Sequence, residues 1–71
     1  MQYVIILESR SINAEYFTGG RYIYQGDVYA TLGNRQEAKR FKSAKVAQRS
    51  ADSLNERSTQ PGVFIVSEVD E

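Results

Sequence analysis

Residues 43–54 read SAKVAQRSADSL and decide the fold, because their small apolar side chains follow a helical period. These apolar positions are Ala44, Ala47, Ala51 and Leu54. Ser43 is a residue type that caps helix N-termini. Alanines let a helix lie close to a sheet but bury little area, so we expect Phe41 and Leu54 to supply much of the packing.

The segments on either side of this predicted helix have the composition of β-strands. Val63–Val69 reads VFIVSEV, with its odd-numbered positions forming one apolar face, and Tyr3–Leu7 reads YVIIL. Turns are predicted at Ser9–Asn13 and Pro61–Gly62. Because the two strands are the most apolar, we expect them to lie side by side, with Tyr3–Leu7 central in the sheet. If they run parallel, the helix belongs to a right-handed crossover.

The chain between the first strand and the basic segment before the helix reads as an antiparallel meander. Short strands are predicted at Glu15–Thr18, Arg21–Tyr24 and Val28–Leu32. Turns are predicted at Gly19–Gly20 and at Gln25–Asp27, where glycine supplies the required backbone conformations.

The predicted order β-β-β-(β)-α-β describes an α+β fold with a single, mainly antiparallel sheet of three to five short strands. One amphipathic helix packs on one face of this sheet. A length of 71 residues suits one domain, spanning residues 1–71. Because one helix can shield only one face, the other face must meet something else or stay in water.

The composition weighs against enzymes, cofactors and metals. Without cysteine or histidine the chain cannot form a disulfide or a zinc site of Cys and His ligands. It also lacks the commonest general base and the strongest nucleophile at neutral pH. We therefore expect no catalysis and no cofactor. The formal catalytic candidates are Ser43 with Lys45, or two of Glu8, Glu15 and Asp27. A helix cap and solubility groups explain these residues more simply, since helix positions two apart point in different directions.

The apolar runs of the sequence are short. The longest, Val4–Leu7, falls far short of a membrane span, and from the composition of the opening residues we expect no signal peptide. The absence of cysteine suits a reducing compartment. We expect a cytoplasmic protein that does not bind membranes.

A net charge of zero conceals a basic segment at residues 35–49, which holds a single acid, Glu37. Asn34 and Glu37 have the spacing of a capping box, which predicts a helix start. A continuous helix would align the basic side chains as a stripe: Arg35, Lys39, Lys42, Lys45 and Arg49. Such a stripe would face solvent, steer the protein towards an acidic protein surface, or contact nucleic acid together with nearby rings.

Tyrosine is concentrated in the meander, where four of the five tyrosines lie: Tyr16, Tyr22, Tyr24 and Tyr29. Tyrosine is enriched at protein interfaces, because it buries a large area at little entropic cost. In a strand, Tyr22 and Tyr24 share one face and Arg21 and Ile23 the other. The four tyrosines are therefore the predicted anchors for a partner.

Three stretches carry a resemblance: Tyr16-Phe17-Thr18-Gly19, then Ala38-Lys39-Arg40-Phe41-Lys42-Ser43, then the helix positions Ala47, Ala51 and Leu54. In these stretches the chain resembles a group of short, largely uncharacterised proteins of bacteriophages and prophages. In that group a Tyr-x-Thr-Gly-like turn precedes an Ala-x-x-Phe-x-Ser step into a helix. The resemblance covers most of the chain, and it implies that Ala38 and Phe41 seat the segment before the helix. It also implies a mobile-element origin and a host-interaction role.

The leading hypothesis is a small non-catalytic phage-type protein in the cytoplasm of a bacterial host. It would bind a host or phage protein through the four tyrosines, with the basic stripe steering it, and could inhibit a host system. Two alternatives stay open. One is a nucleic-acid-contacting module that uses residues 35–49, and the other is a structural homodimer that closes the open face on itself.

Overall fold

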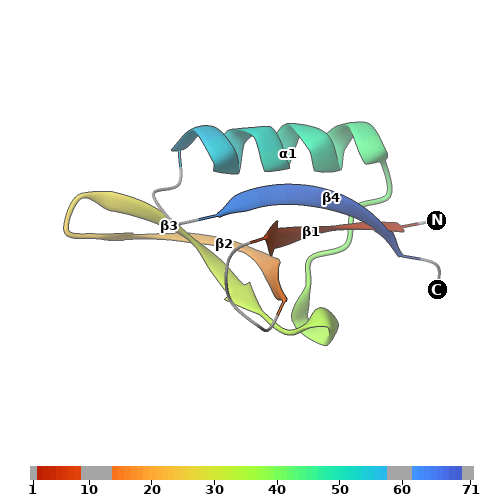
Figure 1. Ribbon diagram of the computed structural model, residues 1–71, viewed down its shortest axis with the longest axis horizontal. Coiled ribbons are helices and arrows are strands. Elements are labelled where there is room, and N and C mark those ends of the chain that lie inside the picture. The colour runs from red at the N-terminus through yellow and green to blue at the C-terminus, as the bar shows by residue number, and fades with distance from the viewer. Residues whose placement is uncertain (1, 9–13, 58–61, 70–71) are drawn as a thin grey trace.

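The computed structural model describes residues 2–8, 14–57 and 62–69, which form one open sheet with one α-helix lying on it (Figure 1). The predicted α+β class is confirmed, with three strands before the helix and one after it. The elements are β1 (Gln2–Glu8), β2 (Glu15–Tyr24), β3 (Asp27–Gly33), the 3₁₀ helix η1 (Arg35–Glu37), α1 (Ala44–Arg57) and β4 (Val63–Val69). The predicted turn at Ser9–Asn13 and the residue Pro61 lie outside the described residues.

The sheet has the strand order β3-β2-β1-β4, and each neighbouring pair is antiparallel. The expected pairing of the first strand with the last is confirmed: β1 pairs with β4 over its full length, from Gln2 opposite Val69 to Glu8 opposite Val63. Because this pair is antiparallel, α1 is not part of a parallel crossover. β1 is a central strand, as its continuous apolar sequence predicts.

The helix α1 follows the period read from the sequence. The Ser43 hydroxyl accepts a hydrogen bond from the Val46 N–H at 3.5 Å, so Ser43 is the N-cap. The buried residues of the helix are Ala47, Ala51 and Leu54. Ala44 was expected on this face but is exposed, because it lies in the first turn at the end of the helix. The alanines allow α1 to lie directly on β1 and β4.

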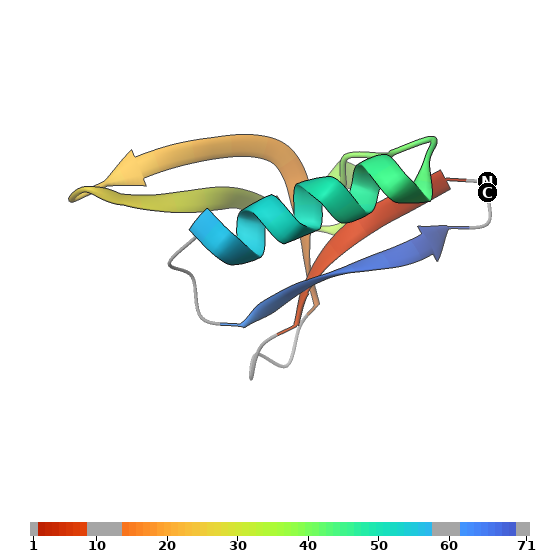
Figure 2. The same ribbon diagram turned by 90° about the horizontal axis from the view of Figure 1, so that it is seen from above.

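The expectation of a turn at Gly19–Gly20 is wrong, because these glycines lie inside the continuous strand β2. Phe17 pairs with Leu32 and Arg21 pairs with Ala30, so three residues of β2 oppose the single residue Thr31 of β3. This arrangement is a β-bulge with two extra residues, and it bends β2 strongly (Figure 2). The two predicted strands on either side of the glycines are therefore one bent strand.

The side chain of Thr31 holds this bulge together. Its hydroxyl accepts a hydrogen bond from the Gly20 N–H at 3.0 Å and donates to the Gly20 carbonyl at 3.1 Å. The Thr18 hydroxyl lies 2.6 Å from the Thr31 hydroxyl. Gly19 has a φ of 106°, a conformation that favours glycine, and an added Cβ there would lie 3.0 Å from the Cδ of Lys39. The bulge thus depends on one hydroxyl and one glycine.

The substitution Thr31→Val should lower the free energy of unfolding by about 1–3 kcal/mol, because it keeps the shape but leaves the polar groups of Gly20 unpaired. Urea denaturation followed by circular dichroism measures the loss. Thr31→Ser, which retains the hydroxyl, is the matched control and should lose much less. Equal stability of the wild type and Thr31→Val would contradict this account of the bulge.

The prediction of a helix beginning at Asn34 is correct only for one turn. Asn34 and Glu37 form the capping box, but it caps the 3₁₀ helix η1, and Ala38 is already extended with φ −60° and ψ 134°. The chain then enters the gap between β1 and β2. Phe41 exchanges two backbone hydrogen bonds of 2.8 Å with Tyr3, and the Lys39 N–H donates to the Phe17 carbonyl at 2.9 Å. Residues 38–41, here called the wedge segment, thus lie between β1 and β2 as a short extended piece of chain.

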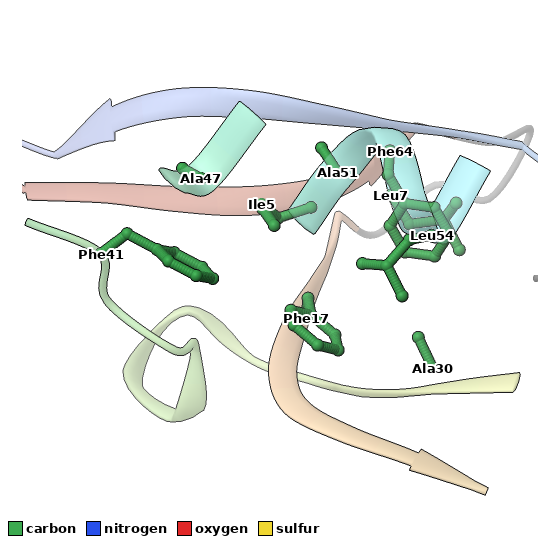
Figure 3. Close-up of a cluster of buried hydrophobic side chains, with 9 residues drawn as sticks. All are labelled: Ile5, Leu7, Phe17, Ala30, Phe41, Ala47, Ala51, Leu54 and Phe64. Atoms are coloured by element: carbon green, nitrogen blue, oxygen red, sulfur yellow. The ribbon is translucent and has the colours of Figure 1, made fainter. Parts of the chain in front are cut away.

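Two clusters of buried side chains lie on opposite sides of the sheet. The larger lies between α1 and the sheet and contains Ile5, Leu7, Phe17, Ala30, Phe41, Ala47, Ala51, Leu54 and Phe64 (Figure 3). Phe41 and Leu54 belong to it, as predicted. The smaller contains Val4, Ala38 and Val69. Ala38 belongs to the wedge segment and packs against Val4 and Val69. The wedge segment therefore covers part of the sheet face that α1 leaves open.

This shielding is incomplete along β4. The even-numbered residues Phe64 and Val66 pack on the larger cluster, so the odd-numbered apolar positions face away from α1. Among these, Val63 and Ile65 are exposed. The imbalance expected from a single helix is therefore present in the folded chain.

Candidate functional site: a tyrosine-bearing hairpin arm

The two long strands β2 and β3 continue beyond the bulge as a hairpin, here called the hairpin arm (residues 21–30). It projects past the C-terminal end of α1 (Figures 1 and 2). Its turn consists of Gln25 and Gly26, both with positive φ values of 52° and 85°. Positive φ at both central residues is typical of the type I′ turn, whose twist matches that of the flanking strands. The predicted turn in this region is confirmed, with Asp27 as the first residue of β3.

One side of the arm faces the helix. Ala30 is buried in the larger cluster beneath α1, and the Arg21 Nη2 donates a hydrogen bond to the Ser53 hydroxyl of α1 at 3.3 Å. Arg21 and Ala30 are opposite each other in the register. Because side chains alternate along a strand, their neighbours point away from α1. The residues that point away are Tyr22, Tyr24, Asp27 and Tyr29.

We call Tyr22, Tyr24 and Tyr29 the tyrosine face. Tyr22 and Tyr29 are directly opposite each other, and their rings are stacked with centroids 5.4 Å apart and planes 19° apart. Tyr22 is 51% exposed and Tyr24 is 60% exposed, whereas Tyr29 is half-buried. Stacking restricts the rotamers of Tyr22 and Tyr29 in the folded chain, so these two rings have little side-chain entropy left to lose.

The fourth predicted anchor does not join this face. Tyr16 pairs with Gly33 on the other side of the bulge and packs, half-buried, on the smaller cluster. Gly33 is four residues along β3 from Tyr29, which corresponds to about 13 Å. The structure thus brings three of the four tyrosines together and places Tyr16 in the body of the sheet.

Ile23 is not among the predicted site residues, although its side chain is 74% exposed. It lies on the helix side of the arm, opposite Val28 and next to the turn. The alternation of β2 placed Ile23 on the other face from the tyrosines, but only the length of the projecting arm shows that α1 does not reach it. Both sides of the tip therefore carry apolar groups.

The basic side chains do not form the expected helical stripe, because the backbone is extended between η1 and α1. Arg35 belongs to η1, and Lys42 precedes the Ser43 cap. Lys39 is in the wedge segment, with its Nζ 5.5 Å from the centre of the Phe41 ring. Lys45 and Arg49 are the two of the five that share α1, one turn apart.

The tyrosine face itself carries no basic side chain within residues 21–30. Its charged member is Asp27, opposite Tyr24 at the turn, while Arg21 points to the other side and bonds to Ser53. The tyrosine face is thus neutral to acidic, and the five basic residues of the predicted stripe lie outside the arm.

The structure does not bring the candidate catalytic residues together in one site. Ser43 serves as the cap of α1. Glu15 and Asp27 lie at opposite ends of the hairpin, about 20 Å apart along the strands. Glu8 is near Glu15, but Leu7 is the residue opposite Glu15, so the two carboxylates point to opposite faces. No group of three or more acidic residues that could hold a metal ion is found within the described residues.

Comparison with protein family models, with curated proteins and with solved structures finds no match to this chain. Within residues 2–8, 14–57 and 62–69, no helix is long and apolar enough to cross a membrane. The site defines this chain as a small α+β protein with a projecting aromatic hairpin.

The stacked pair should show energetic coupling. In a double-mutant cycle with Tyr22→Ala and Tyr29→Ala, we expect the two substitutions to be non-additive by about 0.5–1.5 kcal/mol in the free energy of unfolding. Urea denaturation of the four proteins measures this. A parallel cycle with Tyr16→Ala and Tyr22→Ala spans the bulge and should be additive. Coupling that is absent from the first cycle would show that the stack contributes nothing.

Proposed function

We propose that this chain is a non-catalytic protein-binding module that docks through the tyrosine face. The observation that carries the proposal is the exposure of Tyr22 and Tyr24 next to the stacked Tyr29, on an arm that projects from the sheet. Tyrosine is among the residues that most often dominate the free energy of binding at protein interfaces. A projecting hairpin can also enter a concave surface that the flat body of the sheet cannot reach.

The charge of the face favours a protein partner over nucleic acid. Proteins that bind single strands combine stacking rings with basic side chains that contact the phosphates beside them. Here the charged residue beside the rings is Asp27, which would repel phosphate. Arg21, the basic residue of the arm, is turned towards Ser53. The rings are therefore better suited to the apolar and hydrogen-bonding groups of a protein surface.

A second exposed apolar surface competes with the tyrosine face. It comprises Val63 and Ile65 of β4, on the side away from α1. Leucine and valine are under-represented among the residues that contribute most to the free energy of binding at protein interfaces, whereas tyrosine is enriched. Two aliphatic side chains also offer less area than three tyrosines. The tyrosine face is for these reasons the primary site.

The partner that we propose is a protein of a bacterial host or of the phage itself. This part rests on the resemblance of the chain to short phage and prophage proteins. A non-catalytic arm that docks on this partner would cover a surface that the partner needs, which is the simplest way to inhibit a host system. The encounter would take place in the bacterial cytoplasm.

The double variant Tyr22→Ala/Tyr24→Ala should bind the partner protein much more weakly than the wild type does. We expect recovery of the captured protein from nuclease-treated bacterial lysate to fall at least tenfold, since a typical anchor contributes about 2 kcal/mol or more. Quantitative mass spectrometry of the captured material measures the loss, with circular dichroism to verify the fold.

The matched control for this experiment is Val46→Ala/Ile65→Ala, which removes two exposed apolar side chains elsewhere. It should capture the partner as the wild type does. Equal capture by the tyrosine variant and the wild type would overturn the proposal. So would tight binding of single-stranded oligonucleotides whose affinity falls linearly with salt on logarithmic axes.

The basic residues of α1 would act at longer range, by steering the chain towards an acidic partner. Lys45→Gln/Arg49→Gln should then slow association several-fold at low salt and leave dissociation nearly unchanged. Surface plasmon resonance with the captured partner separates the two rates. An unchanged association rate would show that these side chains only face solvent.

A further inference from the structure

β4 is the last strand on one side of the described sheet, so one of its two edges is open. Its apolar, β-branched sequence is of the kind that pairs readily with another strand. The side chain of Asn55, on α1, reaches the backbone of this strand. Its Nδ2 donates to the Phe64 carbonyl at 3.0 Å, and its Oδ1 accepts from the Phe64 N–H at 2.7 Å.

These two bonds fix which backbone groups of β4 point outward. In an antiparallel strand the N–H and C=O of one residue point to the same side, and successive residues alternate. Since Phe64 bonds to Asn55 rather than to β1, its groups point to the open edge. The unbroken register of β4 then gives Val66 and Glu68 the same orientation.

The opposite side of β1 agrees with this orientation. Tyr3, which is opposite Glu68, directs both its N–H and its C=O at Phe41 of the wedge segment. Tyr3 and Glu68 are therefore a pair without mutual hydrogen bonds, as the alternation requires. The outward groups of β4 thus belong to Phe64, Val66 and Glu68, and Asn55 occupies those of Phe64.

The Asn55 amide directs one N–H and its oxygen at Phe64 side by side, as the N–H and C=O of a residue in an added antiparallel strand would be directed, so Asn55 takes the place of such a residue. We propose that Asn55 is an edge-protecting residue that prevents a second copy of the chain from pairing along β4. With Asn55 in place, an added strand can bond only at Val66 and Glu68. That short overlap is too small to hold two copies together.

The substitution Asn55→Ala tests this directly. It frees Phe64, so the outward groups of three alternate residues become available to β4 of a second copy. We expect the variant to form a dimer in light scattering at concentrations where the wild type is a monomer. In hydrogen exchange, the amides of Val66 and Glu68 should become at least tenfold more protected as the concentration rises.

Two further variants separate edge pairing from simple loss of stability. Ser53→Ala removes another hydrogen bond between α1 and the sheet, to Arg21, and should stay monomeric. Asn55→Ala/Glu68→Pro deletes an outward N–H, which proline tolerates on an edge strand, and should restore the monomer. A dimeric wild type, a monomeric Asn55→Ala, or a dimer that survives Glu68→Pro would each overturn the proposal.

Discussion

The bulge in β2 is the constraint on which the rest of the structure depends. It inserts two residues, an even number, so the alternation of side chains is the same on both sides of it. Phe17 before the bulge and Arg21 after it both face α1. An insertion of one residue would have turned the tyrosines under the helix and the arginine into water. The bulge therefore bends the strand without exchanging its faces, and the arm leaves the sheet with its rings outward.

The same bend creates the gap that the wedge segment fills. β1 and β2 pair only near Ile6 and Leu7 before they diverge, and Phe41 then takes the place beside Tyr3. The wedge segment therefore adds buried side chains on both faces of the sheet, one of which α1 does not cover. The phenyl ring of Phe41 extends the core under α1, while Ala38, three residues earlier, shields Val4 on the other side. A segment of few residues thus contributes to both clusters.

The sequence predicted the features that depend on local patterns. The alanine period of α1, the Ser43 cap and the strand Val63–Val69 follow from spacing and residue type alone. The errors lie where a local signal has two structural meanings. Gly19–Gly20 suits a turn or a bulge, and the Thr31 hydroxyl that decides between them is distant in sequence. The role of Asn55 had no local signal, because its partner Phe64 follows a connection whose path the sequence does not specify.

The outer edge of β4 and the tyrosine face of the arm are both open to solvent, but only the edge of β4 is partly covered by another side chain. This difference supports the proposed binding role of the arm. At β4 the hazard is unpaired backbone, and an asparagine from α1 closes it at Phe64. On the arm, positions 22 and 24 point away from α1, where polar side chains would face water without loss of core packing. Tyrosines occupy these positions instead, at a cost in exposed aromatic area. A chain that protects the edge of β4 and leaves Tyr22 and Tyr24 exposed has the asymmetry that the proposed docking role requires.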